Sequence, residues 1–408
     1  MDDMTHFLKN GNQLLSIVSR GSTILGYLVI DSLVAGRSCG GLRLLPDIDE
    51  WEMRQLARAM TLKYGFLGLP QGGAKAGVRG DPEGPLTVRR KRLMEFGEAI
   101  APLLQNRIYV PGTDMGTDVD DIRYMLKGIG VPIKYRELRK NDSGYYTAVS
   151  VFTSVKQAVR HLRKDLSKCT VAIEGFGKVG SALAGLFQDI GVRVVAVSIS
   201  KGAIYNPHGL DIKVLKELTA KAGSQAVKLY RKAKHIESKE LLELPVDILC
   251  PCARHDSVNE ENAALISAHI ICSGANNPVT PEAEAVLYNK GVLCLPDFVT
   301  NCGGVLGGTM EFASVKKNKI ATFIDANLGP PVARLLEKAE SQNLHPRVIA
   351  TRLSLQRSEE VRRRAARPTP LAKLFSLVLS LYRCGLIPGP IVAHFSLPYF
   401  RNLLTLDI

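Results

Sequence analysis

The residue best suited to proton chemistry in this chain is Lys75, which lies in the stretch GLPQGGAKAG at residues 68–77. Small neighbours allow a protein to enclose a lysine closely, and burial disfavours the charged ammonium and lowers its pKa. A second lysine, Lys63, lies upstream and can lower the same pKa further by charge repulsion. A lysine tuned in this way can exchange protons near neutral pH. The alternative is an exposed lysine on a flexible glycine loop.

A second candidate for proton transfer is Asp114, which lies between glycines in the stretch VPGTDMGTD at residues 110–118. The glycines allow close approach of a ligand to the backbone beside this carboxylate. The alternative is a turn or helix-capping aspartate, because aspartate is common at both kinds of position.

Residues 175–180 read GFGKVG and fit the pattern G-x-G-x-x-G between a short apolar strand and a helix. In that setting the first glycine makes a tight turn, the second lets the backbone approach a pyrophosphate, and the third allows close helix–strand packing. The helix N-terminus then presents free N–H groups to the phosphates. We predict a dinucleotide site formed by Gly175, Phe176, Gly177, Lys178, Val179 and Gly180. The alternative is a glycine-rich helix start without a ligand.

The acid expected at the end of the second strand of such a site is missing, since residues 196–202 read AVSISKG. An acid there hydrogen-bonds the ribose hydroxyls and repels a 2′-phosphate. Because Ser198, Ser200 and Lys201 occupy this region instead, we expect NAD or NADP as the cofactor and favour NADP. The alternative is a polar turn that contacts no ligand.

The elements that must position these residues alternate between strand and helix. In the first half we expect strand character at 24–34, followed by helix, glycine-rich loop and helix at 50–65, 68–80 and 86–104. In the second half, strands at 169–174 and 192–197 flank a helix at 181–190. This βαβ unit implies a parallel sheet with a right-handed crossover. Further apolar strands are expected at 246–250, 269–272 and 292–295, which gives a doubly wound α/β domain.

The length of 408 residues exceeds what one hydrophobic core usually supports, so we expect more than one domain. We predict an N-terminal α/β substrate-binding and catalytic domain at 1–140 and a Rossmann dinucleotide-binding domain at 141–303. We expect the remaining segment, 304–408, to be helical and to pack back, at least partly, on the first domain.

The net charge of +14 attracts anions in general, but the basic residues are scattered and no nucleic-acid motif accompanies them. We therefore expect small-molecule partners, with no specific nucleic acid and no membrane. Cys250 and Cys252 form an isolated C-x-C pair, so we expect no metal site. The cysteines have mainly apolar or small neighbours, and no apolar run has the length of a membrane span, which favours a cytoplasmic protein with reduced thiols.

Several stretches between about residues 24 and 312 together resemble the glutamate/leucine/phenylalanine/valine dehydrogenases. They are GGLRL (40–44), LARAMTLKYGFLGLPQGGAKAG (56–77), PGTDMGTD (111–118), GFGKVG (175–180), SGANNP (273–278) and PDFVTNCGGV (296–305). Their order and spacing match the family, which is more specific than any single motif. The resemblance implies a nicotinamide-dependent oxidation of an L-amino acid to its 2-oxo acid and ammonia, and the reverse reaction. It also implies a homo-oligomer, often a hexamer or octamer.

The resemblance implies roles for individual residues. Lys63 matches the lysine that binds the substrate α-carboxylate, and Lys75 matches the catalytic lysine. Asp114 matches the aspartate that transfers protons to and from the amino group. The glycines of residues 175–180 match the cofactor loop. Asn276 and Asn301 match asparagines that line the cleft where nicotinamide and substrate meet.

The substrate pocket departs from the pattern of glutamate-specific members. These usually carry a lysine just before the first Gly-Gly pair, whereas here Cys39 precedes Gly40 and Gly41 and supplies no charge. The rim at 304–309 is also glycine-rich where a serine is expected for glutamate. Both departures favour a substrate with an uncharged side chain, unless the missing charge is replaced by Arg37 or Arg43.

Two other functions were weighed against the dehydrogenase. A non-catalytic dinucleotide-binding regulator is consistent with the missing ribose acid and with a C-terminal segment that resembles the family poorly. Such a regulator has no need for Lys63, Lys75 and Asp114 together. A nicotinamide enzyme acting on hydroxy acids is disfavoured by the paired lysines and by the absence of a catalytic histidine motif.

Overall fold

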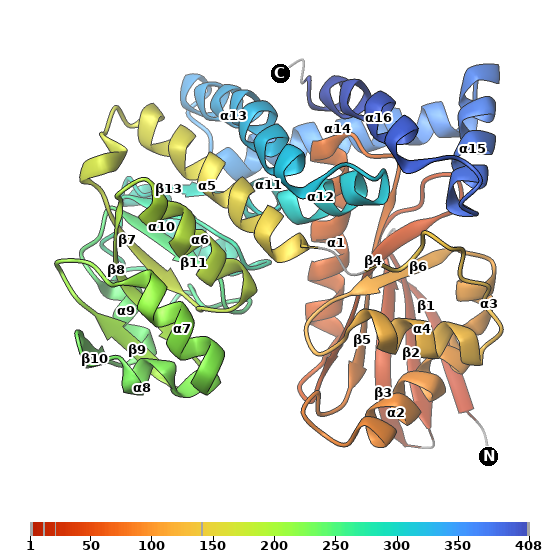
Figure 1. The fold of residues 1–408 in the computed structure, drawn as a ribbon, viewed down its shortest axis with the longest axis horizontal. Helices are drawn as coiled ribbons and strands as arrows, with labels where there is room; N and C mark the ends of the chain where they lie inside the picture. Colours follow the sequence, from red (N-terminus) through yellow and green to blue (C-terminus); the bar gives the residue numbers. More distant parts are fainter. Residues whose placement is uncertain (1–2, 11–12, 21, 140–141, 406–408) are drawn as a thin grey trace. The chain divides into compact units, whose positions relative to one another are not determined.

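The computed structural model describes residues 3–10, 13–20, 22–139 and 142–405. The chain forms two compact α/β units with a helical C-terminal segment, which confirms the predicted fold class (Figure 1). Unit 1 comprises Met1–Asn141, Phe312–Ser314 and Leu353–Leu397, and unit 2 comprises Asp142–Glu311, Val315–Arg352 and Pro398–Ile408. The domain boundary expected between residues 140 and 141 falls outside the described residues.

Unit 1 is built on a six-stranded sheet with the order β1-β2-β3-β5-β4-β6. The strands are β1 (Asp3–Asn10), β2 (Gln13–Arg20), β3 (Thr23–Ile30), β4 (Ser38–Leu45), β5 (Gly72–Arg79) and β6 (Tyr109–Thr113). β4 runs parallel to both β5 and β6, whereas β3 runs antiparallel to β5. The helices that follow these strands are α1 (Glu50–Leu67), α2 (Leu86–Ala99), α3 (Ala101–Gln105) and α4 (Val119–Gly128).

Helix α1 packs on the sheet face that carries Lys75. The Asp49 carboxylate caps its first turn by accepting the Glu52 N–H at 2.8 Å, and Gly68 ends it with a φ of 66°. A Cβ on Gly73 would lie 2.3 Å from the backbone nitrogen of Thr61, so glycine is required where β5 approaches α1. The expectation of a glycine-rich loop at 68–80 was therefore wrong for residues 72–79. The small residues of this stretch let a central strand lie close to a helix.

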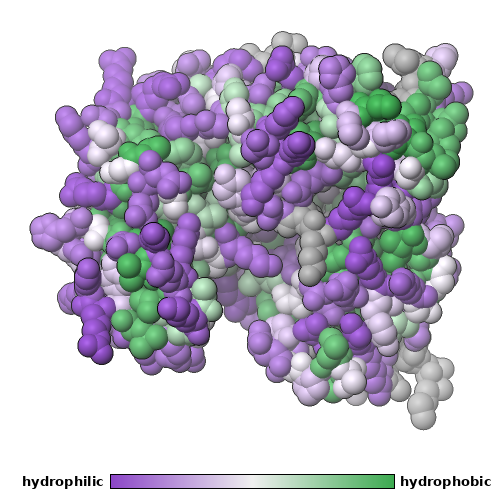
Figure 2. Space-filling view, viewed as in Figure 1, coloured by the Kyte–Doolittle hydropathy of each residue, from purple (hydrophilic) through white to green (hydrophobic). Residues whose placement is uncertain are grey.

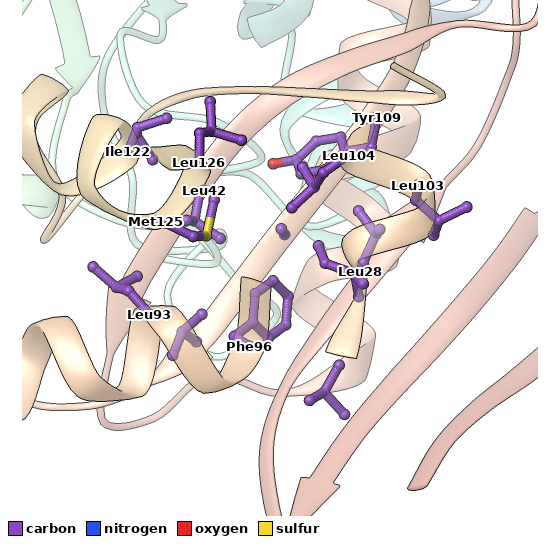
Figure 3. Packing of buried hydrophobic residues seen from close by; sticks show 14 of the residues in the cluster. Leu28, Leu42, Leu93, Phe96, Leu103, Leu104, Tyr109, Ile122, Met125 and Leu126 are labelled. Carbon is purple, nitrogen blue, oxygen red and sulfur yellow. The ribbon is translucent and has the colours of Figure 1, made fainter. Parts of the chain in front are cut away.

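The opposite face of the same sheet is covered by α2, α3 and α4. Figure 3 shows the apolar side chains that fill this interface, including Leu42 from β4, Phe96 from α2 and Met125 from α4. All three are fully buried. This packed layer fixes β4, β5 and β6, whose residues form the candidate site on the other face.

Unit 2 contains a seven-stranded sheet with the order β10-β9-β8-β7-β11-β12-β13. The strands are β7 (Thr170–Glu174), β8 (Arg193–Ile199), β9 (Gly202–Tyr205), β10 (Lys234–Ile236), β11 (Ile248–Pro251), β12 (Ile270–Cys272) and β13 (Leu293–Leu295). β8, β7, β11, β12 and β13 are parallel, as predicted, whereas β9 and β10 turn back antiparallel. A core of buried aliphatic side chains, which includes Leu249 and Ile271, packs against this sheet.

The helices of unit 2 include a long pair, α5 (Ser143–His161) and α13 (Lys317–Ser341), which contact each other along their length. Thr153 on α5 donates a hydrogen bond to Asp325 on α13 at 2.8 Å. This contact accounts for the place of residues 315–352 in unit 2, whereas Leu353–Leu397 belong to unit 1. The other helices are α6 (Lys178–Asp189), α7 (Ile212–Ala222), α8 (Ala226–Leu229), α9 (Ser238–Glu243), α10 (Pro281–Asn289), α11 (Asp297–Thr300) and α12 (Gly303–Phe312).

The chain ends in three further helices, α14 (Pro346–Ala366), α15 (Pro370–Arg383) and α16 (Gly389–Leu404). Tyr382 on α15 anchors this segment in unit 1, because its hydroxyl hydrogen-bonds Ser314 at 2.6 Å. The outer side of α15 exposes apolar residues, and Figure 2 shows hydrophobic surface at the upper right, where this helix lies. Leu374 and Leu377 are 56% and 58% exposed. None of the helices built from the described residues combines the length and apolar character needed to cross a membrane.

Candidate active site

The predicted proton-transfer residues, Lys75 and Asp114, meet on unit 1. Lys75 lies in the middle of β5, and Asp114 directly follows β6, so the central parallel strand β4 separates their elements. Their side chains form an ion pair between Lys75 Nζ and Asp114 Oδ2, and only 4% and 15% of the two side chains is exposed. A Cβ on Gly41 of β4 would lie 2.8 Å from the Cβ of Asp114, so the second glycine of the Gly-Gly pair makes room for this carboxylate.

A second buried ion pair, Arg43–Glu52, lies beside the first. Arg43 Nη1 donates to Glu52 Oε1 at 2.5 Å, and Arg43 Nε lies 3.6 Å from Asp114 Oδ2. Both side chains are almost fully buried, at 6% and 3% exposure. The Arg43 guanidinium is therefore paired with the carboxylates of Glu52 and Asp114. It is not available to replace the charge that Cys39 lacks.

This arrangement shifts the protonation of both central groups. Burial lowers the pKa of Lys75, and the charge of Arg43 lowers it further, although Asp114 and Glu52 oppose the shift. Arg43 is thus a cation that lowers this pKa, and a further contribution from Lys63 stays a prediction. Burial raises the pKa of Asp114, but the charges of Lys75 and Arg43 outweigh this effect and hold that pKa below its usual range. The aspartate stays ionised beside a lysine that loses its proton more easily than an exposed one.

The predicted substrate-binding residues lie on neighbouring elements. Lys63 is on α1 and is 5% exposed, and Cys39 is the second residue of β4. Cys39 shares a hydrogen bond with Tyr64, the residue that follows Lys63 on α1. Burial raises the pKa of the Cys39 thiol, so this position carries no charge at neutral pH.

The glycine motif of unit 2 has the geometry that a pyrophosphate needs. Gly175 has a φ of 89°, which favours glycine, and Gly177 caps the start of α6 with open space where a Cβ would lie. A Cβ on Gly180 would lie 1.9 Å from the carbonyl oxygen of Gly175. No side chain of the described residues caps the first turn of α6. Its N–H groups can therefore serve an anion.

The other predicted residues of the cofactor loop differ in accessibility. Phe176 is buried, and its N–H donates to the Ser198 carbonyl at 2.7 Å, whereas Lys178 is exposed and Val179 is partly buried. The Ser198 hydroxyl accepts the Gly175 N–H at 2.9 Å and is itself buried. Ser198 thus supports the loop from beneath. Ser200 follows the end of β8 and is exposed, where a ribose-binding side chain is expected.

The two predicted asparagines of unit 2 lie together. Asn301 follows α11, and its amide group donates to the Asn276 side-chain oxygen at 3.0 Å and to the Ala275 carbonyl at 2.7 Å. The Oδ1 atom of Asn301 is buried and accepts no hydrogen bond from the described residues. A free acceptor of this kind suits an amide N–H of a ligand. The glycine loop and this acceptor both fit a nicotinamide dinucleotide.

Comparison with protein families identifies the chain. The family description "Glutamate/Leucine/Phenylalanine/Valine dehydrogenase" matches residues 141–364, and "Glu/Leu/Phe/Val dehydrogenase, dimerisation domain" matches residues 17–130. The chain belongs to this family. The resemblance inferred from the motifs is thereby confirmed, and the chain is a member of a family of amino-acid dehydrogenases.

Individual relatives of this amino-acid dehydrogenase extend over most of its length. It is 36% identical over 302 residues to a glutamate dehydrogenase of Thermotoga maritima, covering 70% of this chain and 72% of the relative. It is 30% identical over 367 residues to an NAD-specific glutamate dehydrogenase of Staphylococcus aureus, covering 84% and 86%. Among solved structures, it resembles a hetero-hexameric glutamate dehydrogenase of Thermus thermophilus with a TM-score of 0.72, 26% identity and coverage of 83% and 84%.

Three residues of the dehydrogenase site were missed by the sequence analysis. Glu52 and Tyr64 are buried residues of α1, and no pattern in the sequence singled them out. The third is Glu174, the last residue of β7, which directly precedes the glycine motif. Its Oε2 accepts the Ser257 hydroxyl at 2.9 Å, and burial raises its pKa to about 7.

A Glu174→Gln substitution is expected to stabilise the protein by about 2–3 kcal/mol more at pH 8 than at pH 5. The folded-state pKa of about 7 exceeds the unfolded value of about 4.3. The stabilisation from proton binding is therefore complete below the unfolded value and is lost as the pH rises through 7. Glutamine keeps an acceptor for Ser257 and never ionises. Urea unfolding at the two pH values measures the difference.

The matched control is Glu237→Gln, because the Glu237 side chain is 68% exposed. It should alter stability little at either pH. An offset for Glu174→Gln that is equal at pH 5 and pH 8 would contradict the role assigned to ionisation.

Proposed function

We propose that this protein oxidises an L-amino acid with an uncharged side chain to its 2-oxo acid and ammonia, with NAD or NADP as the hydride acceptor. The observation that carries the proposal is the buried Lys75–Asp114 ion pair beneath Gly41. A protein that only binds a dinucleotide has no need to bury these two charges together, because such burial is costly.

The residues of unit 1 supply the acid–base chemistry of the proposed reaction. Lys63 binds the α-carboxylate and thereby orients the substrate, since hydride transfer requires close contact. A bound nicotinamide would supply the hydride acceptor at the α-carbon. Lys75 takes a proton from the water that adds to the oxidised, iminium form of the substrate, and a carbinolamine forms. Asp114 relays this proton from Lys75 to the nitrogen, Lys75 then takes the hydroxyl proton, and the C–N bond breaks to release ammonia and leave the 2-oxo acid.

The preference for an uncharged side chain rests on Cys39. This position has a neutral thiol hydrogen-bonded to Tyr64, and Arg43 is held by Glu52. A substrate carboxylate placed here would lose its water without gaining a cation, which disfavours glutamate. Leucine, valine and phenylalanine carry no such penalty.

The choice of cofactor rests on the end of β8. The described residues 196–202 include no acid to repel a 2′-phosphate, and Ser200 and Lys201 are exposed there. NADP is therefore the preferred cofactor of the proposal, with NAD as the alternative. We also propose a homo-oligomer, hexameric or octameric. The dimerisation-domain match to residues 17–130 and the exposed apolar side of α15 support assembly.

The function is tested by following reduced-cofactor absorbance with a panel of L-amino acids, using NAD and NADP separately. We expect turnover with leucine, valine or phenylalanine and little with glutamate. Turnover with glutamate alone keeps the enzyme but rejects the uncharged pocket. If no amino acid is oxidised while the dinucleotide still raises the Tm, the protein is a binding regulator.

A Cys39→Lys variant tests the pocket within the same experiment. A lysine ammonium can pair with a substrate carboxylate, so the preference for glutamate over leucine should rise about 10- to 100-fold in kcat/KM. Cys39→Ser serves as the matched control because it keeps a small, neutral side chain. An unchanged ratio in Cys39→Lys would show that this residue does not contact the substrate side chain.

A further inference from the structure

Unit 1 carries a group of cationic side chains that the proposed reaction does not use. They come from the turn before β4, from the region after α3 and α4, and from the end of α15: Arg37, Arg107, Lys134, Arg136 and Arg383. Glu137 is the one carboxylate that the described part of the chain brings into contact with them. Arg136, Glu137 and Arg383 lie outside both segments matched by the family, whereas Arg37 and Arg107 lie within the segment 17–130.

Glu137 is already occupied by other donors. Arg107 donates to both of its oxygens, at 2.8 and 3.3 Å, and the Lys134 N–H donates to Oε2 at 3.0 Å. Arg383 Nε remains 4.0 Å from Oε1, beyond hydrogen-bonding distance. These contacts outweigh the effect of burial and keep the pKa of Glu137 below its usual value. One ionised carboxylate therefore faces several cations.

Two of the arginines have a guanidinium N–H group without an acceptor. The Nε atoms of Arg136 and Arg383 are both buried and donate a hydrogen bond to no described residue. Arg383 pairs with Glu137 at 4.0 Å and lies 5.8 Å from the centre of the Phe312 ring. The Arg136 guanidinium lies 4.1 Å from the centre of the Tyr382 ring, and its backbone N–H donates to the Arg383 carbonyl at 3.2 Å. A guanidinium stays charged at all relevant pH values, so these buried donors are costly unless an oxyanion accepts from them.

The cations also repel one another. Burial lowers the pKa of the Arg383 guanidinium, and the charges of Arg107 and Arg37 lower it further despite the opposing charge of Glu137. The group is nevertheless reachable from solvent, because 25% of the Arg383 side chain is exposed and Arg37 is exposed. An anion at this place would relieve the repulsion and supply the missing acceptors in a bidentate arrangement.

We propose that Arg136 and Arg383, assisted by Arg37, form a binding site for an oxyanion, the phosphoryl or carboxylate group of a small molecule. The site joins the end of α15 to the turn that leads directly into β4, the strand that carries Cys39 and Gly41. Binding therefore stabilises unit 1 and ties the C-terminal helices to the sheet of the proposed active site. The inference does not depend on the proposed reaction.

The first test is thermal unfolding of the full-length protein in inorganic phosphate, acetate or chloride at matched ionic strength. Phosphate or acetate should raise the Tm by about 2–4 °C relative to chloride. A rise with phosphate only identifies a phosphoryl group as the ligand chemistry, and a rise with acetate only identifies a carboxylate. Equal Tm values in all three salts overturn the proposal.

The second test locates the effect. Arg383→Gln and Arg136→Gln should abolish the anion-dependent rise, and Arg383→Gln should unfold in chloride at a temperature no lower than the wild type, because a repelled charge has been removed. Arg37→Gln, at an exposed position, should reduce the rise without disturbing packing. The matched control is the exposed Arg363→Gln on α14, which should keep the full response. If all three cluster variants retain the wild-type rise, the anion binds elsewhere, such as at the glycine loop, and the proposal fails.

Discussion

Replacement of Lys75 with alanine is expected to lower kcat for amino-acid oxidation by about 10³- to 10⁴-fold. Lys75 is the buried amine beside Asp114, and no other described lysine is paired with that carboxylate. The KM for the amino acid should change much less, because the proposal gives carboxylate binding to Lys63. Initial rates over a range of substrate concentrations separate the two effects.

The pH profile of the wild-type enzyme provides a second readout for Lys75. Burial and Arg43 lower its pKa, so the neutral amine accumulates as the pH rises through a value below 10.4. The rate of oxidation should therefore increase with pH and level off before the ordinary lysine range. The control is Lys127→Ala, because Lys127 is exposed on α4. Near-normal turnover in Lys75→Ala would show that Lys75 is not the base of the proposed mechanism.

Replacement of Asp114 with asparagine is expected to lower kcat by about 10²- to 10⁴-fold. Asparagine fills nearly the same space beneath Gly41 but cannot carry a proton to the leaving ammonia. It also removes a negative charge that raises the pKa of Lys75. The residual activity should therefore begin to rise at a lower pH than in the wild type.

This shift in the pH profile distinguishes a chemical role of Asp114 from a structural one. A variant that was merely misfolded would lose activity at every pH with an unchanged profile. Asp120→Asn is the matched control, because its side chain is 57% exposed on α4. A kcat of Asp114→Asn within a few-fold of the wild type would show that the carboxylate does not take part in proton transfer.

The family and the arrangement of parallel strands in unit 2 could be predicted because their signals are local. Within the glycine motif, Gly175 has a positive φ and Gly180 has no room for a Cβ, whereas Gly177 leaves open space at the start of the helix. Strands such as β7, β11 and β12 are short, buried and apolar, so they stand out from the flanking helices.

The stretch that forms β5 was predicted to be a loop because the reason for its small residues, close packing against α1, lies elsewhere in the chain. Gly73 and Gly77 are small because Thr61 and Met53 of α1 pack against them. A glycine-rich strand and a glycine-rich loop look alike until that helix is in place. The place of residues 315–352 could not be read from the sequence for a similar reason, since α13 belongs to unit 2 through its packing on α5.

The residue types alone determined the glycine motif at 175–180, the uncharged position at Cys39 and the candidate proton-transfer residues Lys75 and Asp114. Only the tertiary structure decided which charges meet. It placed Arg43 against Glu52, hydrogen-bonded the Ser198 hydroxyl to the Gly175 N–H, and brought Arg383 to 4.0 Å from the Glu137 carboxylate, which Arg107 already pairs. The reason is physical: the pKa of a side chain and its availability to a ligand depend on burial and on neighbours within a few ångströms, and strands distant in sequence supply those neighbours.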